Sequence, residues 1–244
     1  MHFTRRAATA AIILAFVLIP FFTPSGVAAQ EATPTMTYSC ETAMTASPMA
    51  GMEGMAMGTP AAGEHDMAGE GVEFDQLYID MMVPHHESII AMAQVAQDRL
   101  SDERLRTMAE TIVTDQEREV AELRGYRDMF YGSPRTMPMD RAMMDMMMER
   151  MPGMGDMDEM AMLMDAGALV GAFCVAEDPD LAFIDLTIPH HQMAIDASMV
   201  AYLQAVHPEI KEIARGVIEA QEREIEELTA IRTELTGEST PASS

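Results

Sequence analysis

Positive charge is scarce in this chain: 15 Lys and Arg residues stand against 40 Asp and Glu residues, which gives a formal net charge of −25 at pH 7. A molecule this acidic repels the phosphates of nucleic acids and anionic membrane surfaces, while it raises the local concentration of cations. The composition therefore argues against binding to nucleic acid and favours a metal cation as the partner.

Cysteine is also scarce, since Cys40 and Cys174 are the only two and no Cys-x-x-Cys motif occurs. This disfavours metal binding by thiolates. In an oxidising compartment, the two cysteines are expected to form a single disulfide that pins the N-terminal arm. Two unpaired thiols are the alternative.

Long hydrophobic runs are missing as well, because the apolar run 7–19 is too short to span a bilayer comfortably. Arg5-Arg6 before it and Val27-Ala28-Ala29 after it complete the three regions of a secretory signal. We predict cleavage after Ala29, an extracytoplasmic protein (secreted, periplasmic or at the cell surface), and no stable membrane span after cleavage. An uncleaved anchor is the alternative, and a twin-arginine signal is disfavoured because residues 7–10 are not the usual apolar ones.

The alternation typical of β-strands is almost absent, and from Phe74 onward apolar residues recur at intervals of three and four. This period predicts α-helices throughout. Pro84 falls inside the first helical pattern, where it predicts a kink, unless a new helix begins there. Ser101 is expected to cap the following helix, and Gly132-Ser133-Pro134 is expected to end it.

The sequence contains an internal repeat with an offset of 105 residues. Pro84-His85-His86 in the first copy corresponds to Pro189-His190-His191 in the second. Four further pairs keep this register without a gap: Asp80 with Asp185, Gln116 with Gln221, Glu119 with Glu224, and Leu123 with Leu228. Because polar residues are duplicated, and not only an apolar pattern, the repeat predicts a paired functional site. It also predicts an all-α four-helix bundle made of two duplicated helical hairpins related by a pseudo-two-fold axis.

Composition divides the rest of the chain. The segment 30–71 is rich in Pro, Gly, Ala, Ser and Thr, which predicts a largely disordered, Met-rich arm. Thirteen methionines lie between Met137 and Met164, in a Met-rich crossover whose residues 156–173 are predicted to form an extra helix. The expected organisation is a signal peptide (1–29), the arm (30–71), a bundle (72–236) with halves 72–132 and 179–236 around the linker 133–178, and a disordered tail (237–244).

The paired histidines indicate a metal site between the hairpins. Facing helices in a bundle lie roughly 8–10 Å apart, so inward imidazoles from opposed helices can meet at one ion. His85 and His190 are placed for this, whereas the next residues, His86 and His191, lie about 100° further round and should face a neighbouring helix or solvent. The repeated Gln and Glu would orient the imidazoles. The alternative is a hydrogen-bond network that only specifies the bundle.

The methionines indicate a soft ion. Four of them are explained most simply as core residues: Met81, Met92, Met108 and Met199. The clusters at 52–57 and 143–148 are flanked by Gly and Pro, and we expect them to be exposed. A thioether suits Cu(I) best among biological ions, so these clusters predict copper capture, with flexible low-complexity filler as the alternative.

An acid before an apolar-Pro-His-His segment, with Gln-x-x-Glu-apolar in the next helix, resembles the domain of unknown function 305 family over about 74–231. The resemblance implies a ferritin-like bundle fold, and some secreted or periplasmic members of that family bind copper and support copper tolerance. The matching positions are Asp80, Pro84, His85, His86, Gln116 and Glu119, and again Asp185, Pro189, His190, His191, Gln221 and Glu224. Two departures make the halves unequal if methionines bind metal: Thr187-Ile188 replaces Met82-Val83, and Ala197 replaces Met92.

We therefore expect an exported, non-enzymatic metal-binding protein that sequesters or transfers Cu(I) or Cu(II) through His and Met ligands. Copper is the expected cofactor. The candidate ligands are His85, His86, His190, His191, Asp80, Asp185, Glu119, Glu224, Gln116, Gln221, Met81, Met82, Met92 and Met193.

Other functions are compatible with a helical bundle. A ferritin-like di-iron oxidase would need Glu-x-x-His on two helices, and this motif does not occur. A zinc peptidase motif begins at His86-Glu87 but has Ile90 where the second histidine belongs. A structural or partner-binding bundle without metal is the remaining alternative, and a homo-oligomer is compatible with each of these functions.

Overall fold

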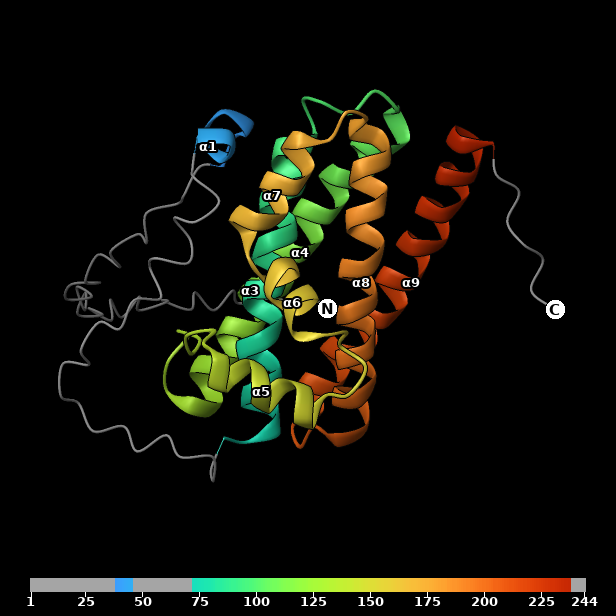
Figure 1. Cartoon of the computed structure of the whole chain (residues 1–244). Helices are drawn as coiled ribbons and strands as arrows, with labels where there is room; N and C mark the ends of the chain where they lie inside the picture. Colours follow the sequence, from blue (N-terminus) through green and yellow to red (C-terminus); the bar gives the residue numbers. More distant parts are fainter. Residues whose placement is uncertain (1–37, 46–71, 238–244) are drawn as a thin grey trace, which may run out of the picture. The chain divides into compact units, whose positions relative to one another are not determined.

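Four long helices, two from each half of the chain, form the frame of the computed structural model (Figure 1). The structure describes residues 38–45 and 72–237. The two hairpins consist of α3 (Phe74–Ala96) with α4 (Glu103–Tyr131), and α8 (Pro179–Gln204) with α9 (Pro208–Thr236). The helices of each hairpin pack along each other, α3 also packs against α8, and α4 meets α9 less extensively. The duplicated hairpins predicted from the repeat are therefore present, and they join mainly through their first helices.

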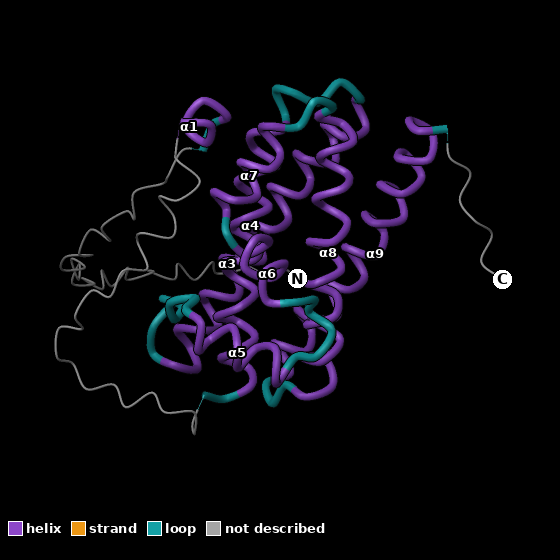
Figure 2. Tube along the Cα trace, viewed as in Figure 1, coloured by secondary structure: helices purple, strands orange, loops and turns teal. Residues whose placement is uncertain are grey.

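Helices and loops make up the whole of the described chain in Figure 2, which confirms the all-α fold class. Pro84 and Pro189 lie inside α3 and α8, which continue through them. The alternative in which a new helix begins at Pro84 is therefore wrong. None of the described helices combines the length and the apolar composition that crossing a membrane requires.

Three shorter helices connect the hairpins: α5 (Arg141–Arg150), α6 (Met157–Met164) and α7 (Ala166–Val175). All three pack against α3, and α7 does so most extensively. The single helix predicted for 156–173 is divided at Asp165, whose side chain accepts a hydrogen bond from the backbone N–H of Ala168 and caps α7. The linker thus covers the first hairpin more than the second.

Methionines of α5 belong to the core and not to an exposed cluster. Those that are buried or packed against the core include Met143, Met144, Met146, Met147 and Met148. The prediction that the cluster at 143–148 is exposed is therefore wrong, because a helix forms here and turns a methionine-bearing face onto the bundle. The other cluster, at 52–57, lies outside the described residues. Of the four methionines predicted to be core residues, Met81, Met92 and Met108 are buried, but the prediction for Met199 is wrong, because its side chain on α8 is 55% exposed.

Cys40 and Cys174 form a disulfide, which confirms the predicted pairing. Cys40 opens a short helix, α1 (Cys40–Thr45), and this helix packs against α7, which carries Cys174. The Arg99 guanidinium donates hydrogen bonds to Cys40 Sγ at 3.1 Å and to the backbone oxygen of Cys174 at 3.0 Å. This part of the arm is therefore helical and not disordered. The predicted signal peptide, the remainder of the arm and the tail from residue 238 lie outside the described residues.

Asp102 is the N-cap of α4, because its side chain accepts a hydrogen bond from the backbone N–H of Arg104 at 2.8 Å. The prediction of Ser101 as the cap is wrong by one residue. Gly132 ends α4 with a φ of 74°, and its repeat equivalent Gly237 ends α9 with a φ of 69°. Glycine adopts this left-handed conformation without a steric penalty, so the helix end predicted at Gly132 is confirmed.

One aspartate ties the first hairpin to the start of α9. Asp75, in the first turn of α3, accepts hydrogen bonds from the backbone N–H groups of Val206 at 2.9 Å and His207 at 2.8 Å. Its Oδ2 also lies 2.7 Å from His207 Nδ1. The His207 ring stacks on Phe130 of α4, with centroids 3.7 Å apart. We call these contacts the Asp75 clasp.

The repeat equivalent of this aspartate ties the second hairpin to the start of α4. Asp180, in the first turn of α8, accepts hydrogen bonds from the backbone N–H groups of Ser101 at 2.7 Å and Asp102 at 3.1 Å. These two residues are the repeat equivalents of Val206 and His207. Each hairpin therefore supplies a carboxylate that holds the second helix of the other, and this second set of contacts is the Asp180 clasp. Together the clasps hold α3 and α8 in a fixed register.

Replacing Asp75 with Ala should destabilise the protein more than replacing Asp180 with Ala. Asp75 is buried, so its loss leaves two partly buried backbone N–H groups and the His207 ring without their partner, whereas Asp180 is partly exposed and water replaces it more readily. In urea unfolding we expect losses of about 2–4 kcal/mol for Asp75→Ala and about 1 kcal/mol for Asp180→Ala. Equal losses for the two variants would contradict this assignment.

Candidate metal centre

Four histidine rings gather where α3 packs against α8. The rings of His85 and His190 are stacked, with centroids 3.7 Å apart and planes inclined by 30°. The centroid of the His86 ring lies 6.1 Å from that of His85, and the centroid of His191 lies 6.0 Å from that of His190. All four side chains are fully buried. The convergence of His85 and His190 predicted from the repeat is therefore present, and we call the four residues the histidine cluster.

The other two histidines each approach a glutamate on the second helix of their own hairpin. His86 Nε2 lies 2.8 Å from Glu119 Oε2 on α4, with hydrogen-bond geometry. His191 Nε2 lies 2.6 Å from Glu224 Oε2 on α9, but the angle does not meet hydrogen-bond geometry. Both histidines therefore face neighbouring helices, and the alternative that they face solvent is wrong. Because a carboxylate accepts hydrogen bonds, the contact with Glu119 favours a proton on Nε2 of His86 and a lone pair on its Nδ1, whereas neither ring nitrogen of His191 has a hydrogen-bond partner.

His190 is held by groups from the opposite hairpin. Its Nε2 lies 3.0 Å from the backbone oxygen of His85 and 3.0 Å from the hydroxyl of Ser88. A carbonyl oxygen can only accept, so His190 Nε2 carries the proton and Nδ1 carries the lone pair. The repeat equivalent of Ser88 is Met193, whose thioether offers His85 no comparable hydrogen-bond partner. Neither ring nitrogen of His85 has a partner with full hydrogen-bond geometry, although the nearby backbone of His190 partly opposes the lowering of the His85 pKa by burial.

Buried polar atoms without partners are concentrated at this site. Within the described residues there are eleven such side-chain atoms in only eight residues, and six of the atoms are imidazole nitrogens. All eight residues lie in the repeated histidine segments or in the repeated Gln-x-x-Glu segments. Each such atom lowers the stability of the folded protein by roughly 1–3 kcal/mol. Their clustering therefore marks a site that packing alone does not explain. In the described chain no three His, Cys, Asp or Glu side chains form a complete ligand set, so the donors are gathered without forming a closed cage.

The two stacked histidines are kept neutral by their surroundings. Burial lowers the pKa of His85 and of His190 well below the ordinary value of 6.5, and the positive charge that neighbouring histidines could carry lowers it further. A neutral imidazole is the form that binds metal ions. The buried position therefore favours the ligating state of both rings.

Two of the candidate ligands, Asp80 and Asp185, are paired with arginines and not with the histidines. Arg127 donates to both carboxylate oxygens of Asp80, at 2.8 and 3.4 Å, in a buried pair. Arg232 donates to Asp185 at 2.7 Å in an exposed pair. Arg127 and Arg232 are 105 residues apart and are therefore equivalent positions of the repeat. The sequence thus indicated that both aspartates have an arginine partner, although the prediction did not include these arginines. Burial raises the pKa of Asp80, against the opposing effect of Arg127.

Amide and hydroxyl groups extend the set of unpartnered atoms. Gln116 and Gln221 are buried one helical turn before the glutamates that approach the histidines, and the side-chain oxygen of each lacks a partner. Thr187, which was not among the predicted ligands, is fully buried with an unpartnered hydroxyl three residues before His190. The sequence held a signal for it, because a threonine replaces Met82 at this position of the repeat.

The four methionines among the candidate ligands are all buried: Met81, Met82, Met92 and Met193. Met82 lies three residues before His85, and Met193 lies three residues after His190, so each adjoins a histidine on its own helix. Met81 also lies one turn before His85. Met92 is two turns beyond His85, about 10 Å along the helix axis, so it lies away from this histidine on α3.

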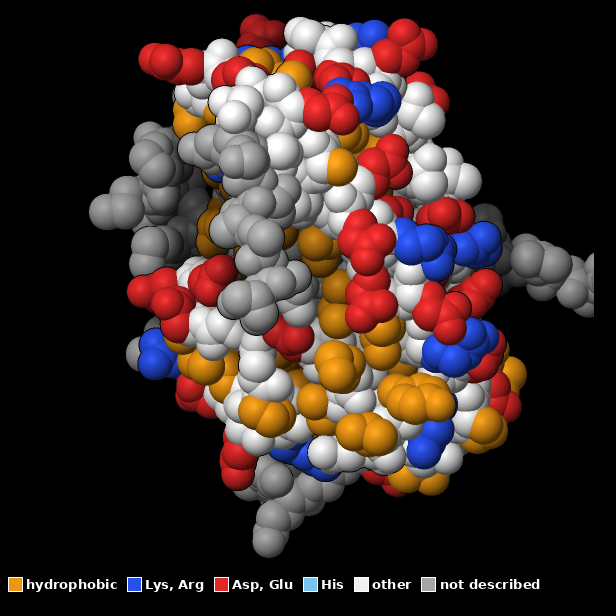
Figure 3. Space-filling model, turned by 90° about the vertical axis from the view of Figure 1, so that its right-hand side faces the viewer, with side chains coloured by type: hydrophobic (Ala, Val, Ile, Leu, Met, Phe, Trp, Pro, Cys, Tyr) orange, Lys and Arg blue, Asp and Glu red, His pale blue; other side chains and the backbone are white. Residues whose placement is uncertain are grey.

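The protein presents acidic side chains to solvent beside an apolar patch. Figure 3 shows the face on the right-hand side of Figure 1, with acidic side chains over its upper and middle parts and hydrophobic side chains gathered lower down. Large exposed hydrophobic residues at the end of α8 and just after it include Tyr202, Leu203 and Val206. Together with the net charge of −25, the acidic surface raises the concentration of cations near the bundle.

Solved structures of similar proteins share this fold. CopM in the Cu(II)-bound form is 27% identical, with a TM-score of 0.50, and the match covers 66% of this chain and 97% of that chain. CopM in the Cu(I)-bound form is 25% identical, with a TM-score of 0.52 and coverage of 66% and 96%. A DUF305 protein from Streptomyces coelicolor is 23% identical, with a TM-score of 0.53 and coverage of 66% and 93%. No curated protein matches the chain.

A protein family also matches the chain, and it does so twice. The family described as "Domain of unknown function (DUF305)" matches residues 25–127 and 122–232. The first match contains nearly all of the first hairpin, and the second match contains the linker helices and nearly all of the second hairpin. Because the two matches together span most of the sequence, the chain belongs to the DUF305 family and contains two copies of its domain.

Proposed function

We propose that the protein binds copper at the histidine cluster, and that it is an exported protein that sequesters the metal or passes it on. The observation that carries this proposal is the set of unpartnered imidazole nitrogens in a fully buried position. Each buried polar atom costs free energy unless a partner satisfies it. A metal ion accepts several nitrogen lone pairs at once, so it would offset this cost at a single point.

Copper fits the chemistry of the donors. Imidazole nitrogens bind Cu, Zn, Fe and Ni, whereas thioethers select Cu(I). Met82 and Met193 supply buried thioethers next to His85 and His190 on their helices. The likeness to CopM supports this choice, because CopM is known in Cu(I)-, Cu(II)- and Ag-bound forms and is 25–27% identical to this chain.

For Cu(I), the ligands we propose are His85 and His190 with a methionine. His85 has two unpartnered nitrogens and His190 has one. By the symmetry of the repeat, Met193 takes next to His85 the place that the Ser88 hydroxyl takes next to His190. We therefore propose the Met193 sulfur as the ligand that binds copper together with His85, the histidine that lacks hydrogen-bond partners.

For Cu(II), we propose that His86 and His191 join the ligand set. Cu(II) prefers nitrogen and oxygen ligands in a tetragonal arrangement. Glu119 is hydrogen-bonded to Nε2 of His86, so the Nδ1 lone pair of that ring remains for the ion, and both ring nitrogens of His191 lack hydrogen-bond partners. The glutamates would orient the rings and raise their basicity, as carboxylates commonly do at metal-binding histidines.

The location we propose is outside the cytoplasm, where the protein would contribute to copper tolerance. The disulfide between Cys40 and Cys174 agrees with an oxidising compartment. The predicted signal peptide and the acidic surface agree with a protein that gathers cations there. The methionines at 52–57 would assist capture, because thioethers bind Cu(I) without a charge of their own.

The alternative functions lack such support. A di-iron site needs several carboxylates, and two candidates here, Asp80 and Asp185, are occupied by arginines. A purely structural polar network would be expected to satisfy its members, whereas the histidine cluster leaves six ring nitrogens without partners. We therefore propose neither an oxidase nor a metal-free bundle.

Copper titration tests the proposed function. Copper-free protein should bind at least about one Cu(I) per chain against a strong chelator, under anaerobic conditions with ascorbate so that the disulfide is kept. The variant His85→Gln/His190→Gln should lose this ion, whereas His207→Gln, which removes an imidazole outside the cluster, should retain it. Wild-type protein that holds less than one ion would refute the function. A double variant with wild-type affinity would refute the site.

Copper-free protein should lose stability as the pH falls from about 7.5 to about 5.5. In the folded protein burial lowers the pKa of His85 and His190, whereas in the unfolded chain both take up protons below the ordinary value of 6.5. The unfolded state then binds more protons, so stability present above pH 6.5 is lost below it, by up to about 2.7 kcal/mol per pH unit for the pair. Urea unfolding at several pH values in this range should show that the free energy of unfolding depends less on pH for His85→Gln/His190→Gln than for wild type. An unchanged pH dependence would contradict the assignment.

A further inference from the structure

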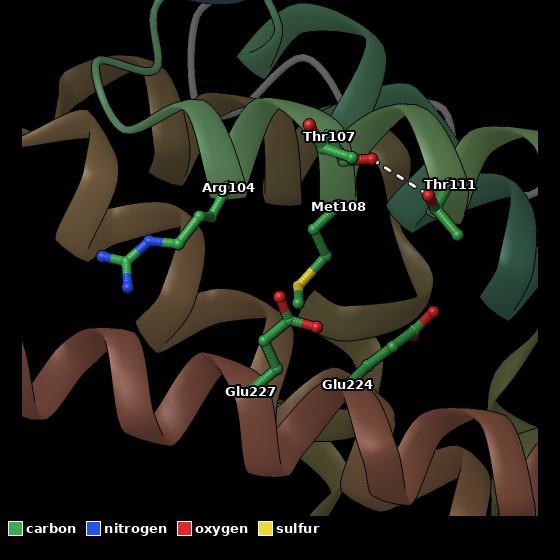
Figure 4. A pocket seen from close by; sticks show the side chains of 6 residues that line it. All are labelled: Arg104, Thr107, Met108, Thr111, Glu224 and Glu227. Carbon is green, nitrogen blue, oxygen red and sulfur yellow. Dashed lines mark hydrogen bonds between the residues drawn. The ribbon is translucent and has the colours of Figure 1, made fainter.

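A groove separates α4 from α9 at the surface of the bundle (Figure 4). It has a volume of about 240 Å³ and is partly open to solvent. Its lining residues are Arg104, Thr107, Met108 and Thr111 of α4 with Glu224 and Glu227 of α9. In Figure 4 the Met108 side chain points from α4 toward the two glutamates. A second depression continues along α4 past Glu110 and Asp115.

Glu224 connects this groove to the histidine cluster. Its side chain lines the groove, while its buried Oε2 has no hydrogen-bond partner and lies 2.6 Å from His191 Nε2. His191 is fully buried, and neither of its ring nitrogens has a partner. A buried ring nitrogen of His191 that has no hydrogen-bond partner thus lies directly behind the Glu224 carboxylate, which lines the groove. This contact distinguishes the groove from a collection of surface acids.

The groups left to meet a cation inside the groove are two carboxylates and a thioether. Arg104 is already engaged by Asp102 and Glu234, each at 2.7 Å, so its charge is neutralised there. Thr107 and Thr111 donate their hydroxyl protons to backbone oxygens one turn earlier on α4. A soft cation that enters therefore meets carboxylates, which attract its charge, and sulfur, which binds it as a ligand.

The equivalent face on the other side of the pseudo-two-fold axis has different chemistry. Ile213 stands there at the position equivalent to Met108, so the thioether is missing. Glu119 on that face is held by a hydrogen bond to His86 at 2.8 Å. Glu224 lacks this restraint, because its contact with the neighbouring histidine does not have hydrogen-bond geometry. The groove therefore offers a carboxylate that can turn between solvent and the cluster without breaking a hydrogen bond to the ring.

We propose that this groove is the route by which the copper ion reaches the histidine cluster, an inference that rests on the function proposed above. Glu227 and Met108 hold the cation first, and Glu224 passes it to His191. Because the ion moves between oxygen, sulfur and nitrogen donors in small steps, it never crosses the core without a ligand. The groove residues govern the rate of uptake and not the amount of copper bound at equilibrium.

The test measures the rate of uptake by the full-length, disulfide-bonded protein separately from the amount bound. Copper-free protein is mixed anaerobically with Cu(I) supplied as its cationic acetonitrile complex. After set times an excess of bicinchoninate captures the ion not yet bound, and its colour reports how much remains. Glu227→Gln and Met108→Leu change the groove, whereas Glu122→Gln and Ile213→Leu change the equivalent positions on the other face.

We expect each groove variant to take up copper at least about fivefold more slowly than wild type with the same final stoichiometry, and the control variants to match the wild-type rate. Equal slowing by groove and control variants would overturn the route, because only the general negative field would then matter. Groove variants that load at the wild-type rate, or that hold less copper at equilibrium, would overturn it as well. Wild-type protein that binds no copper would refute the proposed function, and the route with it.

Discussion

The structure depends on the burial of two stacked, neutral imidazoles that the protein leaves without full hydrogen bonding. His85 and His190 lie in contact where α3 packs against α8, and burial lowers the pKa of both. Such burial is unfavourable by itself. The clasps at Asp75 and Asp180 nevertheless hold the two helices in the register that brings the rings together, and glutamates from α4 and α9 approach the adjacent rings. Much of the polar structure of the bundle is thus arranged around nitrogen atoms for which the protein supplies no partner.

Duplication supplied the same polar residues twice, but the linker made their surroundings unequal. The helices α5, α6 and α7 pack mainly on α3. Accordingly, Asp80 and Arg127 form a buried pair, whereas their equivalents Asp185 and Arg232 form an exposed one. Removing one partner from a buried pair typically costs about 3–5 kcal/mol, and an exposed pair contributes about 0–1 kcal/mol. A symmetrical sequence pattern therefore produces one more sheltered hairpin and one more open hairpin, and the groove lies between their second helices.

The repeat was sufficient to predict the two hairpins and the meeting of His85 and His190. A helical period together with a fixed offset determines which faces two equivalent helices present to each other. The pairing of Arg127 with Asp80 was not predicted, although both residues recur in the second copy of the repeat. An ion pair between two helices depends on their relative rotation, and residue spacing alone does not determine that rotation. The burial of the methionines at 143–148 was predicted wrongly for a related reason, since neighbouring Gly and Pro indicate exposure locally while packing of α5 decides it. The positions of the ring protons likewise depend on interatomic distances and not on residue order.

The most direct test of this arrangement is the protonation state of each imidazole in the histidine cluster, read from long-range proton–nitrogen NMR correlations of the full-length, copper-free protein. The spectra are then repeated after addition of Ag(I), a soft monovalent cation that does not change its oxidation state under these conditions. We predict protons on Nε2 and lone pairs on Nδ1 of His86 and His190 before silver is added, and large nitrogen shifts within the cluster afterwards. Rings that carry their protons on Nδ1, with spectra that silver leaves unchanged, would contradict a metal centre at this position.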